Sequence, residues 1–160
     1  MKGWLRRLAF AFAIAAGMTG CAVALLTVSS IVGRSLASRP IPGDIELTQF
    51  GVALCISLTL PWAQLQGANI IVDFFTHKAS ERTVARLDAI GALLLAVMTG
   101  LLGWRTAIGA LSVGAAGETT MILGLPQWIS YAVLAPGLGL TALIAIEQAV
   151  QRWRGTAATE

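Results

Sequence analysis

Four long apolar stretches, separated by short polar segments, dominate the pattern of residues along the chain. They run from about Leu8 to Val32, Leu47 to Leu65, Leu87 to Trp104 and Met121 to Ile146. A helix needs about 20 apolar residues to cross a hydrocarbon core about 30 Å thick. The pattern therefore predicts an all-α integral membrane protein with four transmembrane helices, forming a single membrane domain over residues 1–160.

The tryptophans mark the ends of these stretches. Indole rings prefer the headgroup level of a bilayer, so tryptophans gather at both membrane surfaces. Every tryptophan of this chain lies near a predicted helix end: Trp4, Trp62, Trp104, Trp128 and Trp153. Their positions support four spans with these limits.

Lysine and arginine are unevenly divided between the two sides that four spans create. The side with both termini and the segment between spans two and three holds Lys2, Arg6, Arg7, Lys78, Arg82, Arg86, Arg152 and Arg154. The opposite side holds Arg34, Arg39 and Arg105. Because basic residues are retained on the cytoplasmic side, we expect both termini in the cytoplasm.

The segment between spans two and three has its own pattern. Ile71, Phe74 and Phe75 share one helical face, and Asp73 and His77 share the opposite face. This pattern predicts a short amphipathic helix over about 69–79 that lies in the membrane interface. An irregular loop with scattered aromatic residues is the alternative.

The first apolar stretch also has two interpretations. Basic residues before an apolar run are typical of a signal peptide, and the sequence before Cys21 is similar to a lipoprotein cleavage site. The apolar core of a signal peptide is only about 7–15 residues long. Here the run continues well past that length, so we expect a retained helix.

Proline and glycine refine the fourth span and the loop before it. Pro126 suits the first turn of a helix, where its missing N–H is not needed. Pro136 lies in the middle of the span, and a neighbouring helix must cover the carbonyl that it frees. The glycine-containing segment 106–120 is expected to be the second outer loop.

The composition excludes a soluble domain. Hydrophobic residues make up 56% of the chain and charged residues 12%, whereas soluble domains carry about 25% charged residues. No basic run with interleaved aromatic residues occurs, so a nucleic-acid partner is not expected.

Titratable side chains are missing from the middle of every predicted span. Asp, Glu, Lys, Arg and His occur only at span ends or in connecting segments. A carrier of organic anions needs a charge or a broken helix near the bilayer midplane. Metal-binding, nucleotide-binding and nucleophile motifs are absent as well. We therefore expect a packing partner without cofactor or catalytic site, rather than an enzyme.

Small residues recur at every fourth position of two spans. Ala9, Ala13, Gly17 and Cys21 form one such stripe, and Ala92, Ala96 and Gly100 form another. Small residues allow helix backbones to approach closely in lipid. The stripes are either assembly faces or chance patterns of alanine-rich helices.

Three short motifs stand near the ends of spans two and four. An acid opens span two, a glycine and an apolar-x-Val-Asp run follow it, and a Gly-Leu-Pro sequence opens span four. These residues are Glu46, Gly67, Ile70, Val72, Asp73, Gly124, Leu125 and Pro126. With these motifs, the chain resembles the small membrane subunit (Q, or DctQ-type) of tripartite ATP-independent periplasmic (TRAP) transporters. The family often has Arg and His where Gln66 and Asn69 stand.

The resemblance implies a function. TRAP systems import organic acids, driven by an ion gradient, in the bacterial inner membrane. A periplasmic solute-binding protein captures the acid, a large (M-type) membrane subunit carries it, and the small subunit packs against the large one within membrane lipid. The family motif then places these positions at a subunit interface: Glu46, Gln66, Gly67, Asn69, Asp73 and Pro126.

Two other functions stay open at this point. A stand-alone transporter or channel, acting as a homo-oligomer, would move solute without a partner. A membrane-embedded enzyme would need a catalytic pair, and Asp73 with His77, one helical turn apart, is the only candidate.

Overall fold

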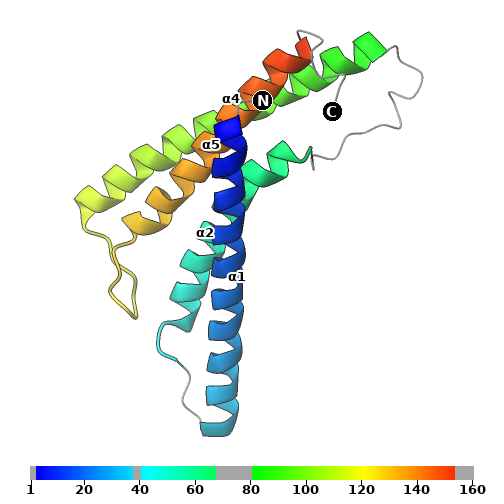
Figure 1. Cartoon of the computed structure of the whole chain (residues 1–160). Coiled ribbons are helices and arrows are strands. Elements are labelled where there is room, and N and C mark those ends of the chain that lie inside the picture. Colours follow the sequence, from blue (N-terminus) through cyan, green and yellow to red (C-terminus); the bar gives the residue numbers. More distant parts are fainter. Residues whose placement is uncertain (1–2, 38–40, 68–80, 154–160) are drawn as a thin grey trace.

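The computed structural model describes residues 3–37, 41–67 and 81–153 of the chain. Its helices are α1 (Gly3–Ala37), α2 (Asp44–Leu65), α4 (Glu81–Ala116) and α5 (Trp128–Trp153) (Figure 1). All four are long and apolar enough to cross a membrane. The described residues contain no strand beyond one isolated antiparallel bridge between Thr119 and Pro126. The predicted all-helical fold with four candidate spans is confirmed.

The segment predicted as an interfacial helix, 69–79, lies outside the described residues. Asn69, Asp73 and His77 lie there too. The amphipathic helix therefore stays a prediction.

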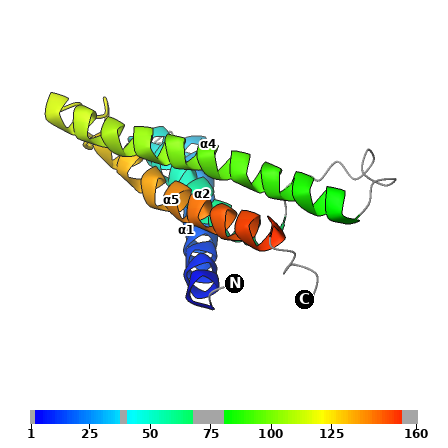
Figure 2. The same ribbon diagram turned by 90° about the horizontal axis from the view of Figure 1, so that it is seen from above.

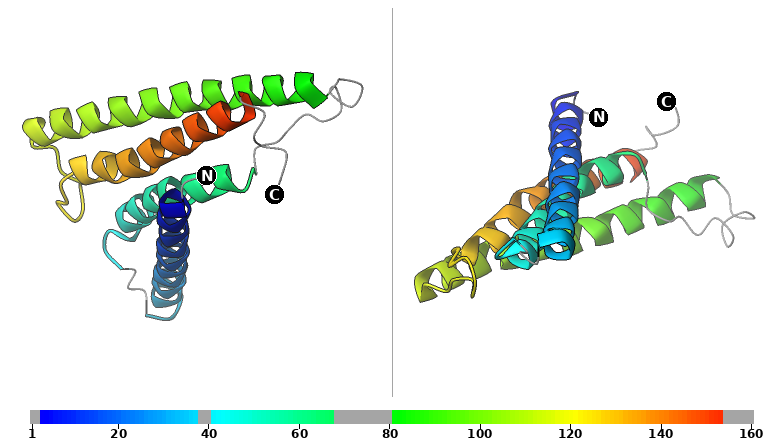
Figure 3. Two further views of the ribbon diagram at one scale, coloured as in Figure 1. Left: turned by 45° about the horizontal axis from the view of Figure 1, so that its top comes forward. Right: turned by 90° about the horizontal axis from the view of Figure 1, so that it is seen from below.

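Helix α5 is the centre of the arrangement. Helix α4 packs along α5, α2 packs against α5 from another side, and α1 packs mainly on α2. Figures 2 and 3 show α4 and α5 running side by side while α1 crosses them steeply. The helices are thus ordered α1–α2–α5–α4 in space, with α1 and α4 as the two flanks of an open assembly.

The helix ends gather at two opposite ends of the molecule. The start of α1, the end of α2, the start of α4 and the end of α5 lie toward one end, called here the terminal end (Figure 1). The turn between α4 and α5, residues 118–127, lies toward the other, called here the hairpin end. Near the terminal end, Leu5 and Ala9 of α1 pack on Leu140 and Ile144 of α5.

The small-residue stripe of α4 faces α5. Ala92 and Ala96 are buried, and a Cβ placed on Gly100 would lie 3.8 Å from that of Ala142. This stripe is therefore used within the chain.

The stripe predicted on α1 is not a continuous packing face. Ala9 is fully buried, but Gly17 and Cys21 are exposed. The buried positions of α1 instead include Ala16 and Ser30. Ala9 and Ala16 are seven residues apart and Ser30 lies fourteen further on, a spacing that keeps one seam of a helix facing its neighbour.

Helix α4 is much longer than the predicted span from Leu87 to Trp104. It continues through most of the predicted loop 106–120 and ends only at Ala116. The reason is packing: Gly109 lies against the ring of Tyr131 and Gly114 against Trp128. These glycines make room for aromatic rings of α5 rather than break the helix.

Helix α5 begins later than predicted, at Trp128 instead of Met121. Pro126 consequently lies before the helix, in the bridge with Thr119, and not in the first helical turn. Hydrogen bonds hold residues 118–127 as a tight hairpin, which competes with helix formation there.

The outer helices are longer than a bilayer core. At 1.5 Å per residue, the 35 residues of α1 and the 36 residues of α4 extend about 52 and 54 Å. A hydrocarbon core is about 30 Å thick. Both helices must therefore tilt, protrude into the headgroups, or do both.

Candidate functional site

The structure brings together two parts of the family motif that are far apart in the sequence. Glu46 lies in the first turn of α2, and its two carboxylate oxygens each accept a backbone hydrogen bond from the hairpin. The Ile122 N–H donates to Oε1 at 2.8 Å and the Leu123 N–H donates to Oε2 at 2.9 Å. These two hydrogen bonds make Glu46 a clasp between α2 and the hairpin.

The hairpin has its own hydrogen bonds. The Thr120 N–H donates to the Leu125 carbonyl at 2.8 Å, and the Gln127 N–H donates to the Glu118 carbonyl at 3.0 Å. The Thr120 hydroxyl accepts from the Leu125 N–H at 3.0 Å. Gly124 turns the chain with a φ of 64°, a conformation that favours glycine. The Gly-Leu-Pro sequence therefore forms the returning arm of the hairpin.

Gly43 completes this contact from the other side. It is buried, has a φ of 73°, and lies so close to Leu123 that a Cβ would come within 2.6 Å of Leu123 Cδ1. Leu123 thus packs directly on the backbone that leads into α2.

Asp44 ties α2 to α1 at the same end. Its carboxylate accepts a hydrogen bond from the Ser30 hydroxyl and another from the Ile45 N–H at 2.8 Å. The Arg34 guanidinium lies 3.7 Å away but is 63% exposed, so that ion pair adds little. Sequence reasoning named Glu46 and missed Asp44, although an acid directly after Gly43 at a helix start is a signal for such a contact.

Gln66 and Gly67 lie at the opposite end of α2. The Gln66 N–H donates to the Trp62 carbonyl at 3.0 Å, and the Gly67 N–H donates to the Gln64 carbonyl at 3.2 Å. Gly67 has a φ of 65°, the conformation with which many helices end. Its place in the motif therefore has a structural reason: it stops α2.

The predicted site residues do not form one site. Glu46 and Pro126 lie at the hairpin end, while Gln66 and Gly67 lie about 30 Å away, beyond the last turn of a 22-residue helix. Asn69 and Asp73 are outside the described residues. In the described part of the chain, no group of three or more His, Cys, Asp or Glu side chains could hold a metal ion.

Polar contacts inside the assembly join α2 to α5. The Ser57 hydroxyl lies 3.2 Å from the Val133 carbonyl and 3.0 Å from the Leu134 carbonyl. These carbonyls lie in the turn before Pro136, next to the Ala132 carbonyl that the missing N–H of Pro136 frees. The cover expected for the Ala132 carbonyl itself stays a prediction. Nearer the terminal end, Gln64 Nε2 donates to Gln148 Oε1 at 2.7 Å, and Gln148 Nε2 donates to the Gln64 carbonyl at 3.0 Å.

Comparison with known proteins gives one family. A family model described as the DctQ component of tripartite ATP-independent periplasmic transporters matches residues 23–155. Searches of curated proteins and of solved structures gave no significant match. The matched range contains the C-terminal part of α1 from Val23 on, all of α2, α4 and α5, and the hairpin with its Glu46 clasp. DctQ is a transporter component and not an enzyme family. The chain therefore belongs to the DctQ family, the small membrane component of TRAP transporters.

Proposed function

We propose that this chain is the small permease subunit of a TRAP-type secondary transporter for organic acids. It packs against the large transport subunit and stabilises it, in an uptake system driven by an ion gradient and served by a periplasmic solute-binding protein. The family match over residues 23–155 is the observation that carries this proposal.

The open arrangement of the helices supports a role in packing. Even in α5, the most covered of the described helices, only 39% of the most apolar window is buried, and in α1 and α4 the buried share is 11% and 22%. Leu25 is 68% exposed and Leu111 is 76% exposed. Helices associate in lipid through close packing rather than through the hydrophobic effect. Two uncovered flanks offer a large area for such packing.

The distribution of charge argues against a cargo site in this chain. Residues 8–32, 47–65, 89–104 and 128–146 contain no Asp, Glu, Lys, Arg or His. Arg105 lies within α4, where its side chain is exposed and not buried between the helices. Charged groups within a membrane are costly and usually mark a substrate path. Moving an organic acid is therefore left to the large subunit, and the alternative of a stand-alone transporter or channel is disfavoured.

We further propose that the chain lies in the bacterial inner membrane with both termini in the cytoplasm. The terminal end carries Arg6 and Arg7 on α1, Arg86 on α4 and Arg152 on α5. Retention of basic residues in the cytoplasm places the hairpin end at the periplasmic surface.

The motif residues have two roles in this proposal. Glu46 fixes the shape of the hairpin, so that the surface near Pro126 meets a partner in a defined form. Gln66 and Gly67 end α2 where the chain leads into Asn69 and Asp73, and this end meets the large subunit at the cytoplasmic surface.

Co-purification tests the proposal. A large (M-type) TRAP membrane subunit from the same organism is tagged, co-expressed with this chain and purified in mild detergent, with an unrelated four-helix membrane protein co-expressed as the control. We expect this chain, untagged, to elute with the large subunit in stoichiometric amount and the control to be lost. Elution of the large subunit alone, as a stable and active protein, would refute the proposed role.

A further inference from the structure

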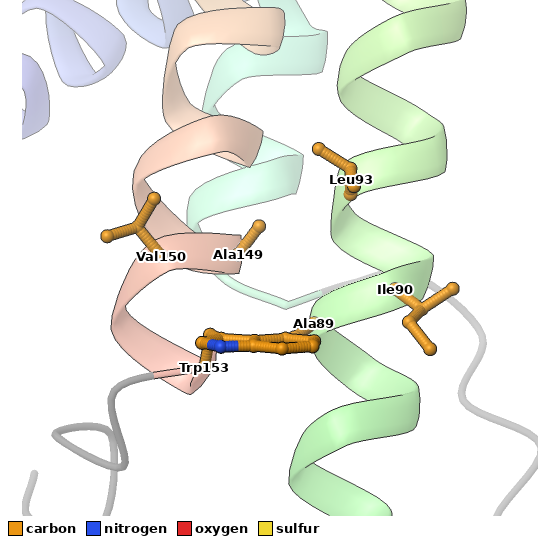
Figure 4. Close-up of a pocket in the computed structure, with 6 residues that line it drawn as sticks. All are labelled: Ala89, Ile90, Leu93, Ala149, Val150 and Trp153. Atoms are coloured by element: carbon orange, nitrogen blue, oxygen red, sulfur yellow. The ribbon is translucent and has the colours of Figure 1, made fainter.

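An apolar groove of about 220 Å³ lies between α4 and α5 near the terminal end. Its lining residues are Ala89, Ile90, Leu93, Ala149, Val150 and Trp153. The two alanines are buried, while the four larger side chains around them are substantially exposed. Figure 4 shows Leu93 pointing from α4 toward α5, and the indole of Trp153 reaching from the last turn of α5 toward Ala89. The groove is thus open to the side and closed at one end by an indole ring.

A positive charge stands at the mouth of this groove. Arg86 precedes Ala89, Ile90 and Leu93 by three, four and seven residues, so it shares their face of α4. It is exposed, and the described residues form no ion pair with it. The nearby acid Asp88 is already engaged, since its Oδ2 lies 3.6 Å from Arg152 Nη1 and its carbonyl 3.5 Å from the same nitrogen.

We propose that the groove binds one acyl chain of an anionic phospholipid, whose phosphate is held by Arg86 at the level of the Trp153 indole. The groove is smaller than the roughly 300–1,000 Å³ of small-molecule pockets, and its lining suits part of a single hydrocarbon chain. Tryptophan and arginine at a helix end lie at the headgroup level, where a lipid phosphate is found. Guanidinium groups bind phosphate strongly.

A lipid fits this groove better than a protein side chain does. An apolar side chain from a neighbouring subunit would match the lining but would leave Arg86 without an anion. A phospholipid satisfies both parts with one molecule. The proposal requires only that Arg86 and Trp153 lie at a membrane surface, and so it does not depend on the orientation of the chain or on its role in transport.

Photo-crosslinking tests the proposal on the full chain. The protein is reconstituted, alone and with the large subunit, into nanodiscs with equal amounts of phosphatidylglycerol and phosphatidylcholine. Either lipid in turn carries a photoactivatable group in its acyl chain, and crosslinked peptides are identified by mass spectrometry. We expect phosphatidylglycerol to label the peptides of Leu93 and Val150 about fivefold more than phosphatidylcholine, because a basic residue near an anionic headgroup contributes about 1 kcal/mol.

Three variants test the groove for the acyl chain and the charge of Arg86 separately. Leu93→Trp fills the groove and should abolish labelling at Val150, whereas Leu94→Trp, equally exposed on α4 but outside the lining, should leave it unchanged. Arg86→Gln should lower the preference for phosphatidylglycerol to about one. Since Arg86 is exposed, this variant tests the proposal even if Leu93→Trp fails to fold.

Three results would overturn the proposal. Equal labelling by both lipids in the protein without substitutions would show that Arg86 does not select an anionic headgroup. Equal effects of Leu93→Trp and Leu94→Trp on labelling at Val150 would show that the acyl chain does not bind in the groove. Loss of labelling when the large subunit is present would show that a protein occupies the groove instead.

Discussion

The closest contact between α2 and α5 gives the sharpest test of the packing described here. Gly137 on α5 is buried against the backbone of Ser57 on α2. A Cβ at position 137 would overlap the Ser57 carbonyl oxygen and would lie 2.6 Å from its carbonyl carbon. Because carbon atoms pack best about 3.5–4.0 Å apart, Gly137→Ala must push the two helices apart by about 1 Å.

The cost of this displacement follows from the contacts that it weakens. Overpacking costs about 1–3 kcal/mol, and alanine returns about 0.8–1.0 kcal/mol through its better helix propensity. The hydrogen bonds from Ser57 to the Val133 and Leu134 carbonyls, at 3.2 and 3.0 Å, would also lengthen beyond the useful range. We expect Gly137→Ala to lower the free energy of unfolding by about 1–2 kcal/mol.

Gly139→Ala is the matched control. This glycine lies two residues further along the same helix, and a Cβ there meets nothing within 4 Å. The variants are heated in mild detergent, and the remaining monodisperse protein is measured by fluorescence-detected size-exclusion chromatography. Gly137→Ala should lower the midpoint temperature, whereas Gly139→Ala should leave it unchanged or raise it. Equal midpoints for the two variants would show that the close approach at Gly137 is wrong.

Three further predictions concern the two ends of the molecule. Glu46→Gln should speed hydrogen exchange of the Ile122 and Leu123 amides, because a neutral amide has one acceptor oxygen where the carboxylate has two. Glu118→Gln, whose side chain is exposed, should not change their exchange, and equal exchange in both variants would exclude the clasp. In a double-mutant cycle, Gln64→Leu and Gln148→Leu should show a coupling of about 0.6–1.7 kcal/mol in thermal stability, the range for hydrogen bonds between membrane helices; additive effects would contradict the paired amides. A membrane-impermeant maleimide should label Thr119→Cys from the periplasmic side of an otherwise cysteine-free chain, and should label a C-terminal cysteine only after the membrane is permeabilised. The reverse pattern would invert the proposed orientation.

The number and approximate position of the helices could be predicted from hydropathy alone. Four apolar runs between tryptophans and basic residues suffice for this, because lipid requires each backbone polar group to be satisfied within a helix. The contact of Ser57 with the Val133 and Leu134 carbonyls was not predictable, because it depends on how α2 packs on α5.

The helix ends near the hairpin could not be predicted, because tertiary contacts decide them. The sequence alone suggests that Gly109 and Gly114 are loop residues. In the structure both lie in α4, where Tyr131 and Trp128 pack on them. In the same way, the sequence alone predicts that an apolar helix starts at Met121 and Ile122. The Glu46 carboxylate, 76 residues away in sequence from Ile122, holds this segment in a hairpin instead.

The motif predicts Glu46 and Pro126 as residues of a subunit interface, and that role stays a prediction. The structure shows that Glu46 accepts hydrogen bonds from Ile122 and Leu123, which lie in the same hairpin as Pro126. Gln66 and Gly67 belong to a different end, because a 22-residue helix separates them from Glu46. Local sequence patterns carry no information about such separations.

Reconstitution tests the central claim most directly, which is that this chain supports transport without carrying the solute. Liposomes containing this chain alone, or with the large subunit and the binding protein, are supplied with a sodium gradient and a panel of radiolabelled organic acids. We predict uptake with all three proteins and none with this chain alone. Uptake by this chain alone would contradict the account.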